Sequence, residues 1–309
     1  MNLNKSEDIF TLTAVDADSW AALIISLLEV LAGTVTSSFI LFDVLRNVFK
    51  GQSLSTKDKI LLALSISNVA SPIILFIYIV SDILWLSLDE ILYIFFYSLI
   101  LYCMSSSSWL TLCLCFFYFI RIMGFRSGYL SMMKKNMDVL VPWTILVVEL
   151  VSLLTSFMNF TLEVLSIDTS SSINTTNGHL SPAKFFEVMY VSNFASYPLI
   201  IVTTGCIMAS VTIHIHRMKR NMSGTMSLVA HHRVVRTMKH LVAFYVLFYV
   251  LLLIEFKELF PYIWSGCTYL IILLMLSPVQ SLIIIHGNTR LHKSWKQMWQ
   301  CPGLRTLFW

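Results

Sequence analysis

The stretch that decides the fold runs from Tyr97 to Arg121 and reads YSLILYCMSSSSWLTLCLCFFYFIR. It is almost continuously apolar, and Arg121 is its first charged residue. At about 1.5 Å of rise per residue, a helix of this length crosses the roughly 30 Å hydrocarbon core of a bilayer. The stretch therefore predicts a transmembrane helix near the middle of the chain.

The rest of the chain has the composition of a membrane protein. Of its 309 residues, 57% are apolar and 12% are charged, whereas soluble domains have roughly 25% charged residues. The mean hydropathy is +0.77. So much apolar surface predicts an all-α integral membrane bundle, and the supply of apolar residues suits about seven spans of ~20 residues.

The apolar runs divide the chain into an N-terminal segment (1–19), a seven-transmembrane-helix bundle (20–286) and a tail (287–309). Segment 1–19 is acidic and lacks the basic start of a cleavable signal peptide, so the first apolar run is expected to direct insertion. The expected helices lie near 20–43, 60–81, 91–121, 139–160, 185–213, 240–260 and 264–286.

The distribution of charge predicts the orientation. Of the 21 Lys and Arg residues, 18 lie in 45–59, 121–136, 214–239 and the tail after 286, and twelve of the seventeen acids lie toward the opposite face. Short basic loops stay in the cytosol. We therefore expect a multi-pass protein with an extracellular N-terminus and a cytoplasmic C-terminus. Its basic inner loops would rest on anionic lipid or also bind an acidic protein.

Two segments outside the membrane carry further signals. The loop 161–184 is polar, and Asn174 begins the triplet Asn-Thr-Thr, so it is a candidate for N-glycosylation. After Gly287 the chain places Leu291, Trp295 and Trp299 on one helical face, which predicts a short interfacial helix 8 against membrane lipids. Cys301 beyond this helix is either palmitoylated or a free thiol.

Several motifs in order resemble the type 2 (bitter) taste receptors, which have the G-protein-coupled receptor architecture. The resemblance rests on Trp109-Leu110 followed by Phe117-Tyr118-Phe-Ile-Arg121-Ile122, and on Gly287-Asn288-x-x-Leu291 at the end of the seventh helix. Further partial matches begin at Glu29, Asp58, Pro198 and Ala230, so the likeness spans nearly the whole chain. It implies a sensory receptor for small molecules that signals through a heterotrimeric G protein.

The chain departs from the family pattern at three positions, where it has Ser37 for Asn, Asn68 for Arg and Gln280 for His. Together with Ser281, these residues are expected to meet in an inner polar core between the first, second and seventh helices. An amide in place of a guanidinium predicts a neutral hydrogen-bonded cluster, because an unpaired buried cation is costly. These departures indicate a divergent member of the family.

By register with the family's pocket positions, Ile100, Met104 and Leu270 would face a ligand. All three are apolar here, so we expect an outer-half pocket that binds mostly lipophilic compounds by shape and burial. A few polar side chains are also expected near this pocket: Asn193, Tyr197, Tyr249 and Tyr269. Ordinary helix packing would explain each of them equally well.

The resemblance also implies an inner face for a G protein of the gustducin-like or inhibitory class. The residues expected there cluster at the cytosolic ends of the third, fifth and sixth helices: Tyr118, Arg121, His214, His216, Arg217, His231, Arg233 and Arg236.

Other classes of protein fit less well. Motifs of zinc peptidases, serine hydrolases and phosphate-binding loops are missing from the sequence, so we expect no enzyme activity and no cofactor. His214 and His216 point to different helical faces, so we expect no metal site, and we expect no nucleic-acid partner. The alternatives that stay open are a vomeronasal type 1-like pheromone receptor and, more distantly, a transporter or channel.

The orientation can be tested with epitope tags. We expect an antibody to label an N-terminal tag on intact cells and a C-terminal tag only after permeabilisation, because the basic loops hold the C-terminus inside. Labelling of both tags on intact cells, or of neither tag before permeabilisation, would overturn both the orientation and the odd number of spans.

Overall fold

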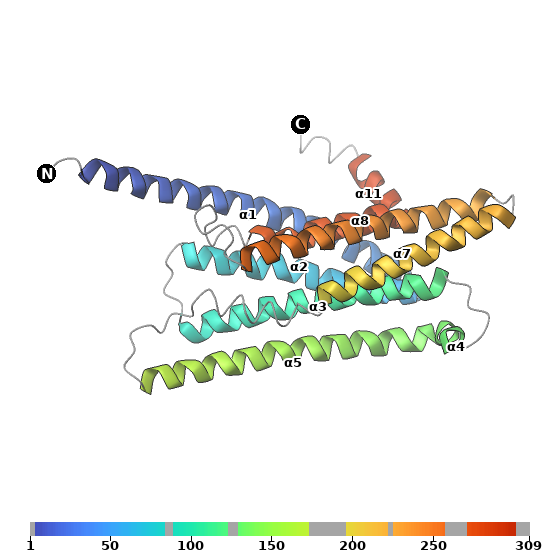
Figure 1. Cartoon of the computed structure of the whole chain (residues 1–309), viewed down its shortest axis with the longest axis horizontal. Coiled ribbons are helices and arrows are strands. Elements are labelled where there is room, and N and C mark those ends of the chain that lie inside the picture. Colours follow the sequence, from blue (N-terminus) through green and yellow to red (C-terminus); the bar gives the residue numbers. More distant parts are fainter. Residues whose placement is uncertain are drawn as a thin grey trace.

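The computed structural model describes residues 4–83, 89–122, 129–172, 196–221, 225–256 and 271–300 (Figure 1). Within these ranges all regular structure is α-helical. The helices are α1 (Asn4–Phe49), α2 (Thr56–Ile83), α3 (Glu90–Ile122), α4 (Tyr129–Lys135), α5 (Met137–Ser172), α7 (Ser196–Asn221), α8 (Thr225–Phe256), α10 (Leu276–Gly287) and α11 (Thr289–Gln300).

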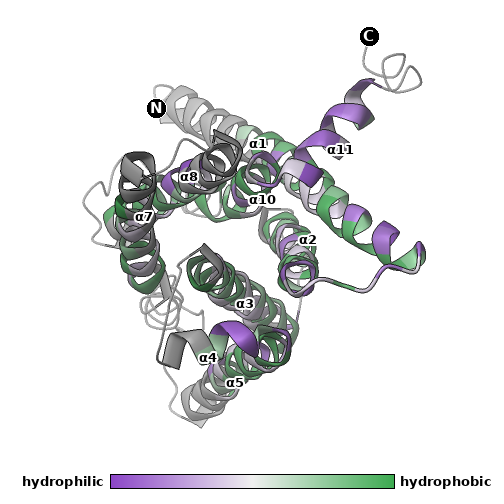
Figure 2. Ribbon diagram, turned by 90° about the vertical axis from the view of Figure 1, so that its right-hand side faces the viewer, coloured by the Kyte–Doolittle hydropathy of each residue, from purple (hydrophilic) through white to green (hydrophobic). Residues whose placement is uncertain are grey.

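The long helices pack side by side as a bundle around a shared core (Figure 2). Contacts run from α1 to α2, from α2 to α3, from α3 to α7, from α7 to α8 and from α8 to α10, and α10 returns to α1. Helix α5 lies outside this ring and packs on α3 and α2. Because α3 contacts α2, α5 and α7, the stretch that decides the fold also occupies the middle of the structure.

The surface of the bundle is that of a protein in lipid. Four described helices are long and apolar enough to cross a membrane, over Leu23–Phe49, Thr56–Ser81, Ile91–Ile120 and Met137–Thr161, and the bent pair of α10 and α11 is a fifth candidate. Large apolar side chains cover the outer face of α5, where Trp143 is 64% exposed. The structure therefore supports a multi-pass helical bundle, and the number of seven spans stays a prediction.

Several helices run beyond the expected apolar spans. Helix α1 begins at Asn4 and so includes most of the segment 1–19, and α5 continues to Ser172. The inner segment 214–239, expected as a loop, is mostly the continuation of α7 and the start of α8. Hydropathy detects only the part of a helix that matches the bilayer, whereas backbone hydrogen bonds propagate the helix into the polar flanks.

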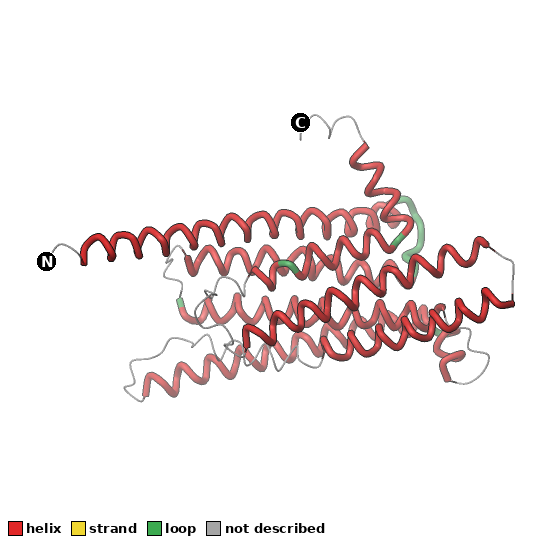
Figure 3. The backbone as a smooth tube through the Cα atoms, turned by 45° about the horizontal axis from the view of Figure 1, so that its top comes forward, coloured by secondary structure: helices red, strands yellow, loops and turns green. Residues whose placement is uncertain are grey.

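The chain bends sharply after the last long helix. Pro278 has no N–H to donate to the carbonyl of Leu274, and the helix is interrupted at Met275, just before α10. Beyond Gly287 the direction changes by 105°, so that α11 turns away from the bundle axis (Figure 3). Leu291 of α11 is fully buried. Trp295 of α11 makes an edge-to-face contact with Phe39 of α1 at a ring-centroid distance of 4.8 Å.

An ion-pair cluster fastens α11 to the ends of α1 and α2. The Arg290 guanidinium donates from Nε to Asp43 Oδ2 at 3.0 Å, and its two terminal nitrogens donate to the two Asp58 oxygens at 3.1 and 3.0 Å. Asp43 and Asp58 are buried. Ser55 also bonds Asp58 at 2.7 Å, at the start of α2. A planar guanidinium can serve both carboxylates at once, which a lysine ammonium does less well.

Replacing Arg290 should destabilise the protein. In Arg290→Ala the two buried carboxylates lose their shared cation, a loss that we expect to cost about 1–3 kcal/mol given the partial exposure of the arginine. The melting temperature of the detergent-solubilised protein should therefore fall by several degrees, and Arg290→Lys should be intermediate. Lys293→Ala, an exposed cation of the same helix, is the matched control, and an equal shift in that variant would contradict the role of the cluster.

Candidate functional site

A layer of buried polar side chains crosses the bundle between two apolar clusters. The outer cluster, named for the expected orientation of most of its members, includes Val30, Leu75, Ile100, Met104 and Leu274, and it continues past the layer at Cys115, Met238 and Leu241. The inner cluster includes Ile40, Leu64, Leu114, Ile284 and Leu291. The polar layer consists of buried residues from four helices: Ser37 on α1, Asn68 on α2, Ser107 and Thr111 on α3, and Ser277, Gln280 and Ser281 on α10.

Serine hydroxyls join α1, α2 and α10 in this layer. Ser37 Oγ lies 2.8 Å from Ser281 Oγ and 3.3 Å from Ser277 Oγ. Ser277 Oγ donates to the backbone carbonyl of Asn68 at 2.5 Å. Small hydroxyl side chains allow helices to approach closely and still pair their polar groups.

Helix α3 completes the layer through Ser107. Its hydroxyl lies 2.7 Å from Asn68 Oδ1 and 3.1 Å from Gln280 Oε1, and it donates to one of these oxygens at a time. The amide nitrogen of Gln280 donates to Thr111 Oγ1. The four residues that sequence reasoning selected therefore lie in one layer, and the side-chain link from Asn68 to Gln280 passes through Ser107, which it had not selected.

The run of four serines on α3 is buried throughout and does not line an open cleft. Ser106 bonds Ser67 on α2 at 2.9 Å, whereas Ser108 donates only to the carbonyl of Met104 in its own helix, at 2.9 Å. Neighbouring serines thus make different hydrogen bonds. Ser106 and Ser107 link α3 to other helices, whereas Ser108 bonds the preceding turn of its own helix.

Two carboxyl groups lie within the bundle. Glu149 on α5 accepts hydrogen bonds from Tyr102 at 2.7 Å and from Ser106 at 2.8 Å, so both of its oxygens are paired with α3. Because Ser106 also bonds Ser67, a second hydrogen-bonded group joins α2, α3 and α5 beside the polar layer. Glu29 on α1 has one buried oxygen with no hydrogen-bond partner among the described residues.

The residues expected to bind a ligand are only partly described. Ile100 and Met104 are 0% and 1% exposed and belong to the outer cluster, and Tyr249 packs against that cluster. These side chains are therefore part of the packed core, in the half of the bundle that we expect to face the outside of the cell. The other expected ligand residues lie outside the described residues or have side chains that do: Asn193, Tyr197, Tyr269 and Leu270, and the same holds for Asn174 and Cys301.

At the opposite end, Tyr118 lies near the end of α3 and packs against residues of both apolar clusters, and Arg236 on α8 is exposed. The remaining residues of the expected G-protein face are in helices, and their side chains lie outside the described part of the structure: Arg121 on α3, His214, His216 and Arg217 on α7, and His231 and Arg233 on α8.

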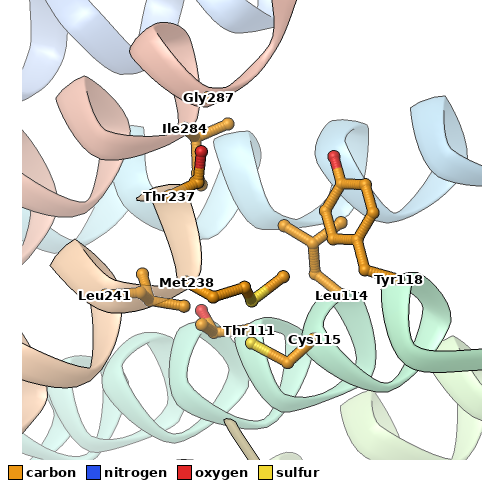
Figure 4. A pocket seen from close by; sticks show the side chains of 9 residues that line it. All are labelled: Thr111, Leu114, Cys115, Tyr118, Thr237, Met238, Leu241, Ile284 and Gly287. Carbon is orange, nitrogen blue, oxygen red and sulfur yellow. The ribbon is translucent and has the colours of Figure 1, made fainter. Parts of the chain in front are cut away.

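A small pocket lies between α3, α8 and α10 (Figure 4). It is on the side of the polar layer that we expect to face the cytosol. About 20 Å³ of it is available to the centre of a water molecule, which is room for about one water. Thr111, Cys115 and Tyr118 line it from α3, and Met238 lines it from α8. Sequence reasoning did not find this pocket, because it depends on how three distant segments pack.

The fold and the polar layer define a class: a multi-pass membrane protein whose helices are joined by buried hydrogen bonds at mid-depth. A family model described as taste receptor protein (TAS2R) matches residues 15–302. The chain therefore belongs to the TAS2R family, a family of bitter taste receptors and not of enzymes. The resemblance drawn from the motifs is confirmed, and the vomeronasal alternative is not supported.

Individual taste receptors also match this chain over most of its length, at low sequence identity. Taste receptor type 2 member 39 of Gorilla gorilla gorilla is 24% identical over 292 residues, covering 89% of this chain and 85% of the relative. The protein of the same name from Papio hamadryas is 25% identical over 294 residues, with coverage of 89% and 85%. Taste receptor type 2 member 4 of Pongo pygmaeus is 23% identical over 294 residues, covering 90% of this chain and 96% of the relative.

The polar layer predicts different effects for two adjacent serines. Ser107→Ala leaves buried oxygens of Asn68 and Gln280 without a donor, and we expect a loss of about 1–3 kcal/mol in unfolding free energy. Ser108→Ala removes only a bond within α3 and should cost much less. Thermal unfolding of the two variants in detergent measures the difference, and equal melting temperatures would contradict the interhelical role of Ser107.

Proposed function

We propose that this chain is a plasma-membrane bitter taste receptor that binds small, mostly lipophilic molecules in the outer half of its bundle. Binding there activates a heterotrimeric G protein of the gustducin-like or inhibitory class at the inner face. The observation that carries the proposal is the TAS2R family match over nearly the whole chain, together with the apolar character of the outer cluster.

The chemistry of the outer cluster supports a lipophilic agonist. The expected contact positions Ile100 and Met104 offer no charge, and the cluster also contains Tyr97, Tyr245 and Phe248. Burial of apolar surface contributes roughly 25 cal/mol per Å², which is enough to hold a small molecule without an ion pair. The flexible side chain of Met104 has three rotatable bonds and can repack around compounds of different shape.

The inner ends of α7 and α8 support coupling to a partner protein. These two helices project past the neighbouring ends of α3 and α5 in Figure 1. Arg236 and Lys239 are exposed on α8, and the sequence adds Arg217, Lys219 and Arg220 at the end of α7. A basic projection at the cytosolic side suits an acidic surface of a G protein, while α11 with its tryptophans suits the lipid interface.

The proposal is tested by a calcium assay in cells that express the chain with a promiscuous G-protein chimera. A panel of lipophilic bitter compounds should give concentration-dependent calcium rises, and a panel of steroids and pheromone-like volatiles should give none. Cells without the chimera are the control. Silence to all bitter compounds at verified surface expression, or solute flux in vesicles that contain no G protein, would contradict the receptor function.

The proposed outer-half ligand pocket predicts different outcomes for two substitutions of Met104. Met104→Gln places an amide among apolar groups and should lower the potency of a lipophilic agonist by about tenfold, equivalent to about 1.4 kcal/mol. Met104→Leu conserves volume and polarity and should change potency little. Dose–response curves at matched surface expression measure both, and unchanged potency in Met104→Gln would remove Met104 from the pocket.

A further inference from the structure

Helices α8 and α10 approach each other closely at one residue of each. A Cβ atom built on Gly287, the last residue of α10, would lie 2.4 Å from both Cγ2 and Oγ1 of Thr237 and 2.9 Å from its Cβ. Threonine is β-branched and has few alternative rotamers in a helix. The two helices can therefore lie this close only because residue 287 has no side chain.

The space beside this contact is incompletely filled. Thr237 and Gly287 both border the small pocket between α3, α8 and α10, and Met238 and Leu241 of α8 reach over it toward Thr111 and Cys115 of α3 (Figure 4). A void has no partner atoms on one side, so its lining forgoes packing contacts. Helix α8 would therefore lose few contacts with α3 if this part of it moved outward.

We propose that the contact between Gly287 and Thr237 is a steric latch that holds the inner part of α8 against α10. With glycine at 287 the helices close over the pocket. Any side chain at 287 favours an arrangement in which α8 stands away from α10 and the pocket opens toward the cytosol. The consequence for signalling rests on the proposed G-protein coupling, since an opened inner face is the arrangement that would admit the partner.

The test uses three variants of the full-length receptor. Gly287→Ala adds one methyl group where the structure has no room for it. Thr237→Ala/Gly287→Ala removes the two closest Thr237 atoms and should partly restore the closed arrangement. Gly205→Ala on α7 is the matched control, because a Cβ on Gly205 would meet nothing within 4 Å.

The first measurement does not depend on a G protein. Cys115 lines the pocket and is fully buried, so its thiol reports whether the pocket is open. Inside-out membrane vesicles are treated with a charged methanethiosulfonate reagent, and modification of the Cys115 peptide is quantified by mass spectrometry. We expect labelling to rise severalfold in Gly287→Ala, to fall back toward wild type in the double variant and to stay unchanged in Gly205→Ala.

The second measurement is agonist-independent signalling in the calcium assay. A severalfold rise in Gly287→Ala, reversed in the double variant, supports the latch and its role in coupling. Raised Cys115 labelling without raised signalling supports the latch and counts against the proposed G-protein function. Unchanged labelling in Gly287→Ala at normal surface expression overturns the latch. If Gly287→Ala fails to reach the surface, rescue by Thr237→Ala supports the contact and failure of that rescue overturns it.

Discussion

Polar groups buried among lipid-facing helices have no bulk water to bond, so each must find a partner within the protein. In this bundle Ser37, Asn68, Ser107 and Gln280, which come from four helices, find their partners within one layer. The layer fixes how the helices are rotated, because a turned helix would leave amide oxygens unpaired in a medium of low dielectric. The apolar clusters on either side have no comparable directional constraint.

The neutral composition of this layer suits an amide at position 68 better than a cation. Asn68 and Gln280 both present carbonyl oxygens to Ser107, and the amide nitrogen of Gln280 reaches Thr111. An arginine at position 68 would need an acid nearby, and the closest members of the layer are hydroxyls and amides. The paired cation and acids lie instead at one end of the bundle, where Arg290 joins Asp43 and Asp58 close to the expected lipid interface. Placing charge at the end and neutral hydrogen bonds at mid-depth lowers the cost of desolvation.

Sequence reasoning reached the family and part of the site. It selected Ser37, Asn68, Gln280 and Ser281 because they stand where the family has polar residues, and the structure brings them together. It did not select Ser107, since four serines in a row look alike in sequence and differ only in the direction of each side chain on α3. It also gave Arg290 no partner, because Asp43 and Asp58 are more than two hundred residues away. Helices α1 and α8 begin earlier than expected, and α5 and α7 end later, because polar residues continue these helices beyond their apolar parts.

The sequence by itself determined the class of protein: long apolar runs, a one-sided distribution of cations and ordered motifs suffice for a membrane helix bundle of the TAS2R family. Each of these features can be read from one segment or summed over the chain. None of them requires knowing which helix packs against which. Only the tertiary structure decided which hydroxyl bonds which amide, how Arg290 is shared between two acids, and that Gly287 lets α8 touch α10. Such contacts depend on the relative rotation and spacing of helices, which are set by the packing of all of them together.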